Sequence, residues 1–260
     1  EHAARSVGAI SMNVAVAQTP ADAVATQLRE TVATIDELSL VDPAAADVLL
    51  AVDDAALRAA VDNEPDRPLL LLPASDSDDT PTDRSTLLAH LAAHAATTVP
   101  TITRRVLSVQ AGDTATRAVR DCAIVTTDPA RISEYRAVTE ETTLTTFRAD
   151  GVVVATPLGT ATYSRAAGGP RLAPDTGLAV VPIAPFAMTA DQWVVSPPLT
   201  LRVERDDAVS VLADGRAVAS GGADLTVSVS VAGSITVVDR RRLGERGRNW
   251  KNSNESSPQD

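Results

Sequence analysis

Hydroxyl side chains gather in one segment of the sequence, residues 150–172, which reads DGVVVATPLGTATYSRAAGGPRL. Residues 152–155 form an apolar run typical of a buried strand, and Pro157 prevents that strand from continuing. Gly159 permits a tight turn without a Cβ clash. Three hydroxyl side chains follow the turn: Thr160, Thr162 and Tyr163. Hydroxyls and backbone groups at a strand terminus are a usual position for a ligand, so the segment predicts a binding corner; a plain strand–turn–helix corner is the alternative.

Histidine and cysteine side chains offer two other kinds of chemistry. His90 and His94 are four residues apart in a helical pattern, so they share a face and could bind a metal. No second pair of ligands is evident, and we favour the alternative of two surface histidines. The single cysteine, Cys122, has apolar neighbours and no histidine near it in the sequence. It is predicted to be a buried strand residue rather than a nucleophile.

Acidic residues outnumber basic ones, 34 to 23, which gives a net charge of −11. Lys251 is the only lysine, and few lysines with many carboxylates suit a cytoplasm of very high salt. The alternative, an acidic surface for a basic partner, is weaker because the acids are scattered, and the net charge argues against nucleic-acid binding. Asp53 and Asp54 with Asp42 or Asp47 could bind Mg²⁺, but acidic clusters are common in a chain of this composition.

The first hundred residues alternate short apolar runs with helical patterns. Runs typical of buried strands occupy residues 13–17, 47–52 and 69–72. Helical patterns occupy residues 20–32, 55–61 and 85–96. This alternation predicts an α/β domain with a parallel sheet over residues 12–100.

From residue 101 to residue 238 the pattern becomes strand after strand, rich in Val, Thr and Ile. The predicted strands are residues 101–109, 118–126, 133–138, 142–148, 152–155, 178–183, 199–203, 208–212, 224–231 and 234–238. Turn signals separate them at Asp128-Pro129, Asp150-Gly151, Asp214-Gly215 and Gly221-Gly222. This half is predicted to be an antiparallel β-sandwich or a β-barrel-like domain. Since aromatics are only 2% of the chain, its core has to be built from Ala, Val, Leu and Ile.

Both ends of the chain read as unfolded. Residues 239–260 are polar with Gly, Ser and Pro and have no apolar period, which predicts a disordered tail. Residues 1–11 precede the first convincing strand and are interpreted as an appendage without a secretory signal. No apolar run approaches the roughly 18 residues of a membrane span. We therefore expect a soluble, cytoplasmic protein without a membrane partner.

The segment at residues 150–170 resembles the signature of the NAD kinase family, in which a strand ends in a Thr-Pro-x-Gly-Ser-Thr-Ala-Tyr turn followed by Ala-Gly-Gly-Pro. The matching residues keep their order and spacing without gaps: Asp150-Gly151, Ala155-Thr156-Pro157, Gly159, Tyr163-Ser164 and Ala167-Gly168-Gly169-Pro170. In the family this turn holds the NAD nucleotide. The resemblance implies substrate-binding roles for Asp150, Thr156, Gly159, Thr160, Thr162 and Tyr163.

Within the turn, three positions depart from the family pattern. Leu158 replaces a small polar residue, and Ala161 and Thr162 stand where the family usually has Thr and Ala. Loss of the hydroxyl at position 161 removes one hydrogen bond, worth about 1 kcal/mol if it was made to a neutral ligand group.

Other segments extend the resemblance over most of residues 101–238. Residues 118–124 match a family strand whose Asn-Glu/Asp pair contacts the ribose and adenine of NAD. Asp121 survives as the acid, which implies a substrate-binding role for it, but Arg120 replaces the asparagine. Two further segments match later family motifs: residues 180–188 and the Asp214-Gly215 turn.

The phosphate-binding part of the family pattern is degenerate in this chain. Where the family carries Gly-Gly-Asp-Gly-Thr, residues 51–55 read Ala-Val-Asp-Asp-Ala. Asp53 matches the catalytic aspartate, which is expected to accept a proton from the 2′-hydroxyl of NAD. Val52 and Asp54 are unfavourable for ATP, because the glycines of such a turn let backbone N–H groups approach phosphates and a second carboxylate repels them.

The resemblance implies an NAD kinase-like fold, with an N-terminal α/β domain and a C-terminal β-sandwich domain. It also implies ATP-dependent phosphorylation of NAD at the adenosine-ribose 2′-hydroxyl, with Mg²⁺ accompanying ATP, and a homodimer or homotetramer. The missing glycines support an alternative: a catalytically impaired paralogue that binds a nucleotide or an active kinase subunit as a regulator. A third reading is a scaffold that keeps only the fold, which Leu158 and Ala161 support.

Overall fold

The computed structural model of the 260-residue chain describes residues 11–17, 23–52, 54–63, 66–73, 83–128, 131–140, 142–187, 190–205 and 208–245. It divides into two compact units. Glu1–Thr103 and Ile235–Asp260 form one unit, and Arg104–Ser234 form the other. The sequence placed a boundary between residues 100 and 101, but did not predict that the chain returns to the first unit at its C-terminal end.

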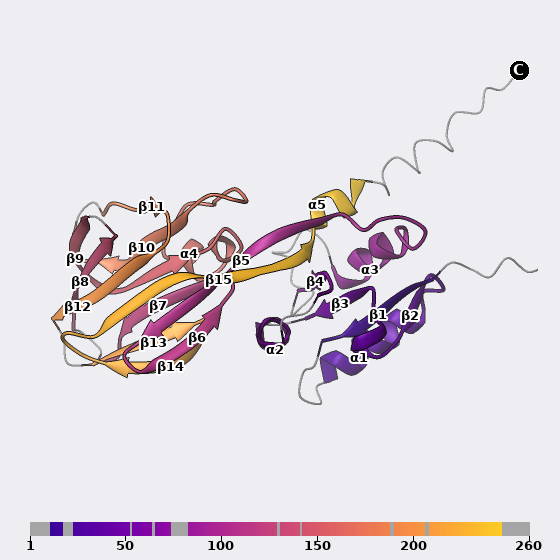
Figure 1. The fold of residues 1–260 in the computed structure, drawn as a ribbon, viewed down its shortest axis with the longest axis horizontal. Coiled ribbons are helices and arrows are strands. Elements are labelled where there is room, and N and C mark those ends of the chain that lie inside the picture. Colours follow the sequence, from indigo (N-terminus) through magenta and orange to yellow (C-terminus); the bar gives the residue numbers. More distant parts are fainter. Residues whose placement is uncertain are drawn as a thin grey trace, which may run out of the picture. The chain divides into compact units, whose positions relative to one another are not determined.

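The first unit is an α/β layer around a parallel sheet (Figure 1). Its strands are β1 (Met12–Val16), β2 (Leu38–Leu40), β3 (Val48–Ala51) and β4 (Leu69–Leu71). Its helices are α1 (Ala23–Ala33), α2 (Asp54–Asp62), α3 (Arg84–Ala92), α5 (Arg240–Leu243) and the 3₁₀ turn η1 (Pro43–Ala45). The strands pair in the order β4-β3-β1-β2, all parallel. This agrees with the predicted α/β domain.

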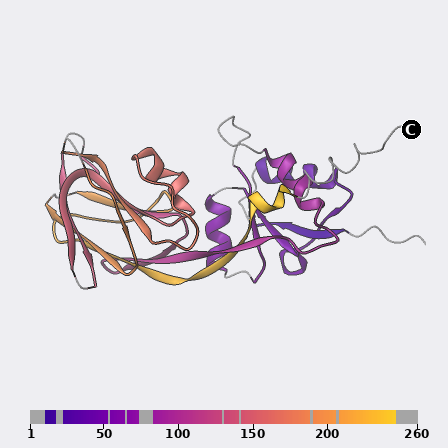
Figure 2. The same cartoon turned by 90° about the horizontal axis from the view of Figure 1, so that it is seen from above.

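Alternate strand residues of this sheet face different helices. Val14, Leu50 and Leu70 pack in one cluster with apolar residues of α1, α3 and α5. On the other face, Ala51 packs with Ala56 of α2. Figure 2 shows these helices and the sheet from a second direction. The strands are buried on both faces of the sheet, so each face has its own apolar layer.

The second unit consists almost entirely of β-strands. Its strands are β5 (Thr101–Ala111), β6 (Thr114–Ala118), β7 (Asp121–Thr126), β8 (Ser133–Thr139), β9 (Thr143–Ala155), β10 (Leu178–Pro185), β11 (Trp193–Val195), β12 (Leu199–Arg205), β13 (Val209–Ala213), β14 (Arg216–Gly221) and β15 (Thr226–Val238). β5 and β15 each contribute residues to both units. Pairing follows the order β14-β13-β7-β9-β8-β12-β15. In addition, β10 pairs with β9 and β11 pairs with β10, while β5 pairs with β15 and β6 pairs with β5.

β9 organises this unit because it pairs with three strands. Its first half pairs with β8 and its second half with β7, while β10 lies along its other edge, all antiparallel. The last residue of β9, Ala155, lies opposite Asp121, the first residue of β7. On its other side β7 pairs with β13, where Cys122 lies opposite Ala213. The loops that follow β9 and β13 therefore flank the turn that leads into β7.

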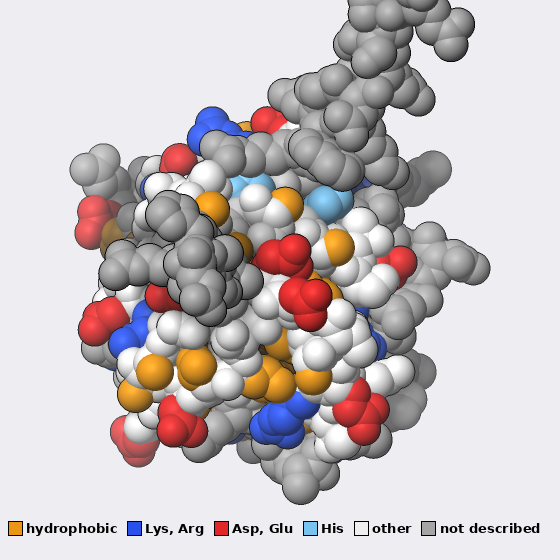
Figure 3. All heavy atoms as spheres, turned by 90° about the vertical axis from the view of Figure 1, so that its right-hand side faces the viewer, with side chains coloured by type: hydrophobic (Ala, Val, Ile, Leu, Met, Phe, Trp, Pro, Cys, Tyr) orange, Lys and Arg blue, Asp and Glu red, His pale blue; other side chains and the backbone are white. Residues whose placement is uncertain are grey.

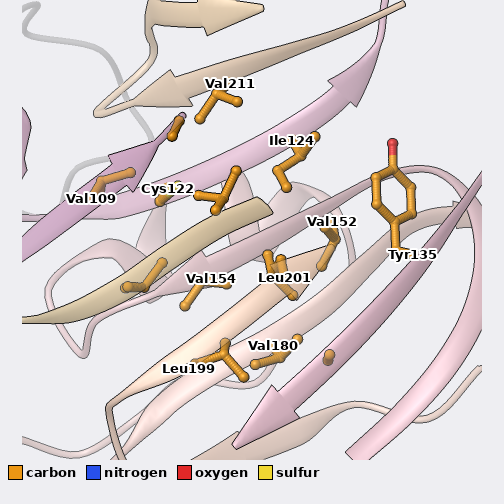
Figure 4. Packing of buried hydrophobic residues seen from close by; sticks show 14 of the residues in the cluster. Val109, Cys122, Ile124, Tyr135, Val152, Val154, Val180, Leu199, Leu201 and Val211 are labelled. Atoms are coloured by element: carbon orange, nitrogen blue, oxygen red, sulfur yellow. The ribbon is translucent and has the colours of Figure 1, made fainter. Parts of the chain in front are cut away.

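Small aliphatic side chains fill the core of the second unit. Cys122, Ile124, Val152 and Val154 lie in one buried cluster with residues from the neighbouring strands (Figure 4). Cys122 is fully buried, as the sequence predicted. Burial and, next, the charges of Asp121 and Asp214 raise the pKa of its thiol to about 12. A thiol in this state is not a nucleophile at neutral pH.

The structure corrects the predicted turn at Asp150-Gly151. Both residues lie inside the 13-residue strand β9, which joins two predicted strands into one. Gly151 serves close packing there, because a Cβ at this position would lie 2.6 Å from the carbonyl oxygen of Ile124. The last two predicted strands likewise form one strand, β15, and the predicted strand at residues 118–126 is divided between β6 and β7.

The predicted tail is ordered at its beginning. Asp239 accepts a hydrogen bond from the Arg241 N–H through its side chain at 3.1 Å, and α5 follows. Leu243 of α5 is fully buried in the cluster formed by α1, α3 and the parallel sheet. The sequence did not predict this helix, because its four residues include a single apolar side chain and show no period. Residues 1–10 and 246–260 lie outside the described residues.

His94 is not the surface residue that the sequence predicted. Only 2% of it is exposed, and its Nδ1 lies 3.0 Å from the carbonyl oxygen of His90 one helical turn earlier. Across the described ranges, no group of three or more His, Cys, Asp or Glu side chains is placed to hold a metal ion. None of the helices in those ranges has the length and apolar character that crossing a membrane requires.

Figure 3 shows a face of the molecule on which acidic side chains are spread out and basic side chains lie among them. The second unit carries ion pairs between exposed arginines and partly buried glutamates: Arg136–Glu204 at 2.9 Å and Arg148–Glu134 at 3.0 Å. The acidic excess is therefore scattered on this face, as expected from the sequence.

Candidate functional site

The predicted binding corner begins where β9 ends. After Ala155 the chain turns through the 3₁₀ turn η2 (Gly159–Ala161) and the short helix α4 (Tyr163–Ala166). The Thr156 carbonyl accepts hydrogen bonds from the N–H groups of Gly159 and Thr160, at 2.9 and 3.1 Å. These bonds close the turn directly after Pro157, as the sequence predicted for residues 156–163.

Gly159 lies against the backbone of Arg120, in the turn that leads into β7. A Cβ at position 159 would lie 2.9 Å from the Arg120 Cα and closer still to the Arg120 carbonyl group. Gly159 is therefore needed because two backbone segments touch at this point, in addition to its place in the turn.

Thr156 ties the corner to the same segment. Its hydroxyl donates to the Val119 carbonyl at 2.7 Å and also lies 3.1 Å from the Arg120 carbonyl, which accepts the Thr156 N–H at 2.8 Å. Thr160 donates its hydroxyl to the Pro157 carbonyl at 3.0 Å. Thr156 and Thr160 are both buried. Their hydroxyls form hydrogen bonds within the corner, and the substrate-binding roles that the resemblance implies for Thr156 and Thr160 stay predictions.

Asp121 and Thr162 meet at the open side of the corner. The Thr162 hydroxyl lies 3.2 Å from Asp121 Oδ2 and 2.8 Å from the Gly159 carbonyl oxygen, so its single proton can be donated to either acceptor. Asp121 is only 4% exposed, and Thr162 is half-buried. The structure thus brings together the acid and the hydroxyl that the sequence placed in different segments.

Tyr163 is the exposed aromatic residue of the corner. Its side chain is 37% exposed, and its pKa is raised by partial burial and by the nearby charge of Asp121. The phenol therefore stays protonated at neutral pH and can donate a hydrogen bond. A flat apolar ring beside a hydroxyl and a carboxylate offers both a stacking surface and polar contacts to a nucleoside.

The glycines after α4 end that helix sharply. Gly168 has φ +85°, and the N–H groups of Gly168 and Gly169 bond to the carbonyls of Arg165 and Ser164, at 3.0 and 2.8 Å. This is a Schellman arrangement, which needs a left-handed residue after the helix. A Cβ at Gly169 would lie 2.7 Å from the Ser164 carbonyl oxygen. The Gly-Gly pair therefore shapes the far side of the corner.

Asp214 is a buried acid at this site that the sequence did not identify as functional. It begins the two-residue turn between β13 and β14, with φ +46°, and it is 4% exposed. Its carboxylate accepts hydrogen bonds from the N–H groups of Val119 at 2.9 Å, Arg120 at 2.7 Å and Asp121 at 3.1 Å. The only sequence signal was the Asp-Gly turn, which says nothing about a partner more than 90 residues away.

Asp150 lies apart from the corner within this chain. It is an exposed residue of β9, five positions before Ala155, which corresponds to roughly 16 Å along a strand. Asp121, Thr156, Gly159, Thr160, Thr162 and Tyr163 therefore form one group, and Asp150 does not join it.

Asp53, the predicted catalytic residue, lies outside the described residues. Its neighbours Val52 and Asp54 lie at the end of β3 and the start of α2. In the order β4-β3-β1-β2, the chain leaves β1 toward one edge of the sheet and β3 toward the other. The carboxyl ends of β1 and β3 thus form a topological switch point, the usual ligand site of an open α/β sheet.

Two of the surface hollows among the described residues have no lining residue in the corner. One of about 520 Å³ lies at the carboxyl ends of β1 and β2, beside Arg29 and Asp42. The other, of about 470 Å³, lies along β9 and β10 beside Phe147 and Trp193, whose rings stack at 5.9 Å. The candidate site is defined by the hydrogen-bonded group around Asp121, which lines neither of these hollows.

Residues 95–237, more than half of the chain, match the family model of the ATP-NAD kinase C-terminal domain. The chain belongs to the NAD kinase family. The matched range of this NAD kinase family member contains the whole corner, Asp121 and Asp214.

Curated NAD kinases share part of this sequence. The chain is 35% identical to the NAD kinase of Methanosarcina barkeri over 109 residues, which are 40% of each protein. It is 32% identical to the NAD kinase of Methanopyrus kandleri over 142 residues, 51% of each protein. The matched part thus spans about two fifths to one half of the length of these relatives.

Solved structures of the family share the fold. The yeast NADH kinase complexed with NADH matches with a TM-score of 0.69 at 15% identity, over 96% of this chain and 89% of that chain. The NAD kinase from Archaeoglobus fulgidus in complex with ATP matches with a TM-score of 0.64 at 19% identity, over 95% of this chain and 99% of that chain. These likenesses confirm the predicted fold class, an α/β part with a β-rich C-terminal part.

Proposed function

We propose that this chain binds NAD at the corner around Asp121 and transfers the γ-phosphoryl group of ATP to the adenosine-ribose 2′-hydroxyl, giving NADP and ADP. The observation that carries the proposal is the contact between Asp121 and Thr162 beside the exposed ring of Tyr163. Membership of the NAD kinase family and relatives named NAD kinase support it.

Asp53 acts as the base in this proposal. The 2′-oxygen forms a bond to the γ-phosphorus while the bond between that phosphorus and the bridging oxygen of ADP breaks, and Asp53 takes the hydroxyl proton. Support comes from the positions of Val52 and Asp54, the described neighbours of Asp53, which follow β3 at the switch point of the parallel sheet. The similar NAD kinase from Archaeoglobus fulgidus, solved in complex with ATP, adds support for that donor.

Mg²⁺ enters this reaction as part of the MgATP substrate. Mg²⁺ is usually held by substrate phosphates and one or two carboxylates rather than by an all-protein cage. Asp54, in the first turn of α2, is the described carboxylate within residues 51–55, the segment that matches the phosphate-binding motif of the family.

Calorimetric titration with NAD and with MgATP, separately and in molar KCl, tests this function together with an assay for NADP. The kinase is supported by binding of both ligands and by NADP production. Asp53→Asn should then abolish turnover, whereas Asp62→Asn, which changes an exposed acid at the other end of α2, should leave it intact. An undiminished rate in Asp53→Asn removes Asp53 from the mechanism.

A second candidate function is a nucleotide-binding regulator that has lost phosphoryl transfer. The observation that favours it is Val52, where the family has a glycine: its side chain is buried in the core of the first unit, 4% exposed. A branched side chain is bound into the fold there, so this position differs structurally from a phosphate-binding glycine. Binding of NAD without NADP formation supports the regulator, and absence of any binding leaves only the fold.

Assembly and location form a separate part of the proposal. The resemblance implies a homodimer or homotetramer, and we propose that the chain works in the cytoplasm. Light scattering on the purified chain tests the assembly, and a monomer at micromolar concentration would contradict it.

A further inference from the structure

We propose that Asp214 is a positioning residue for Asp121, which it holds through the backbone of residues 119–121. This inference rests on the proposed NAD-binding role of Asp121 and adds a residue to that site. Its basis is the convergence of three consecutive N–H groups on one buried carboxylate.

A buried carboxylate requires compensation, and Asp214 has it. Taking a charge out of water is unfavourable unless hydrogen bonds replace its hydration. Asp214 Oδ1 lies 3.2, 2.7 and 3.1 Å from the N atoms of Val119, Arg120 and Asp121, and its Oδ2 lies 2.9 Å from that of Val119. Successive N–H groups that point at one anion form a nest, a backbone arrangement that binds anions.

The carbonyl groups of the same segment are held as well. The Val119 carbonyl accepts a hydrogen bond from the Thr156 hydroxyl at 2.7 Å, and the Arg120 carbonyl accepts one from the Thr156 N–H at 2.8 Å. The Asp121 carbonyl accepts the N–H of Asp214 at 2.9 Å. All six backbone polar groups of residues 119–121 are therefore paired with Asp214 or Thr156. We call this arrangement the 119–121 clamp.

The clamp holds the backbone of Asp121 in place, and the Thr162 hydroxyl contacts the carboxylate at the other end of its side chain. Since a backbone shift of the segment moves the Asp121 Cα directly, the Asp214 carboxylate controls the distance between Asp121 and Thr162, now 3.2 Å. A site that holds a ligand by hydrogen bonds tolerates errors of only about 0.5 Å. Asp214 thus acts on the ligand through Asp121 without touching it.

Asp214→Asn removes the negative charge of the side chain but keeps the conformation of the turn. Asp214 and Gly215 both have positive φ, and they form the two-residue connection of a hairpin, for which Asn-Gly is at least as favourable as Asp-Gly. The amide keeps the size of the side chain but offers one acceptor oxygen in place of two, and its NH₂ group would face N–H donors. The variant therefore damages the clamp and spares the turn.

Asp113→Asn is the matched control. Asp113 also lies in a two-residue hairpin connection beside a glycine, between β5 and β6, but it is exposed. Both variants remove one negative charge from a hairpin turn of the same unit.

The test measures amide resonances of residues 119–121 and Thr162 by NMR, and the affinity for NAD by calorimetry. Asp214→Asn is expected to move these resonances and to weaken NAD binding roughly ten-fold or more, since bonds to a charged acceptor are the strong ones. Asp113→Asn is expected to change neither. A general loss of stability would not by itself lower the affinity of the folded protein at a temperature well below its midpoint.

Two results would overturn the proposal: resonances of Asp121 and Thr162 that stay in place, or an NAD affinity that is unchanged although they move. If the unaltered chain binds no NAD, the proposed function fails, and the resonances of Asp121 and Thr162 alone decide the positioning role. If Asp214→Asn does not fold, Thr156→Val removes a hydroxyl from the opposite side of the clamp. Unmoved Asp121 and Thr162 resonances in that variant would refute the clamp.

Discussion

Gly159→Ala is the substitution whose cost follows most directly from the structure. Nonbonded carbon atoms pack at about 3.5–4.0 Å. The added Cβ would lie 2.9 Å from the Arg120 Cα and closer to the Arg120 carbonyl, which is backbone and cannot rotate away. Either the corner or the turn before β7 has to move.

Two contributions set the magnitude. Overpacking a buried site costs roughly 1–3 kcal/mol. Moving the Arg120 carbonyl also weakens its bond to the Thr156 N–H, 2.8 Å, a further 0.5–1.5 kcal/mol or so. Together these predict a loss of about 2–4 kcal/mol in the free energy of unfolding. For a chain of this size that corresponds to a fall of roughly 4–16 °C in the unfolding midpoint.

Thermal and urea unfolding, followed by circular dichroism, measure this loss. Gly233→Ala is the control, because Gly233 is an exposed strand residue whose added Cβ would meet nothing within 4 Å. Its unfolding free energy should change by less than about 0.5 kcal/mol. Equal midpoints for the two variants would refute the close contact between Gly159 and Arg120.

Three other predictions concern the core, the C-terminal helix and the surface. Because burial raises the pKa of Cys122 to about 12, the native state keeps a proton that the unfolded chain loses above about pH 9. The unfolding free energy should therefore fall with rising pH by up to about 1.4 kcal/mol per unit in that range, and Cys122→Ala should flatten the slope in urea unfolding. Leu243→Ala should destabilise the chain by about 2–5 kcal/mol by leaving a cavity, whereas Leu40→Ala, at a 40% exposed site, should cost much less; equal losses would contradict the docking of α5. With a net charge of −11, the unfolding midpoint should rise between 0.1 and 2 M KCl in calorimetric scans, and a falling midpoint would contradict the expectation of a high-salt protein.

Elements with a strong period were predictable from the sequence. The apolar runs at β1, β3 and β4 and the helical patterns at α1, α2 and α3 match the observed elements to within a few residues. Short edge strands were missed: β2 and β11 have only three residues each, which is too short to show a period, and the six residues of β14 have no clear apolar alternation. Gly151 misled the prediction, because a glycine needed for close strand packing has the same local signal as a glycine in a turn.

The candidate site was predictable only where its signal is local. The turn after β9 follows from Pro157 and Gly159, whose effects on the backbone act within a few residues. The Asp214 carboxylate reaches Val119 across 95 positions in the sequence. That contact depends on the pairing of β7 with both β9 and β13, and no pattern within a single segment indicates it.

The residues of the corner that match the NAD kinase signature do not by themselves indicate catalysis. Thr156, Thr160 and Gly159 are explained by contacts inside the fold, so a chain that has lost phosphoryl transfer would still need them. Their presence supports the fold and a shaped surface for a nucleotide, and it is equally compatible with kinase and regulator. The segment that bears on the choice between the two functions is residues 51–55, where a buried Val52 replaces a glycine next to Asp53. Measurement of NADP formation by Asp53→Asn and by the unaltered chain therefore addresses the segment that distinguishes them.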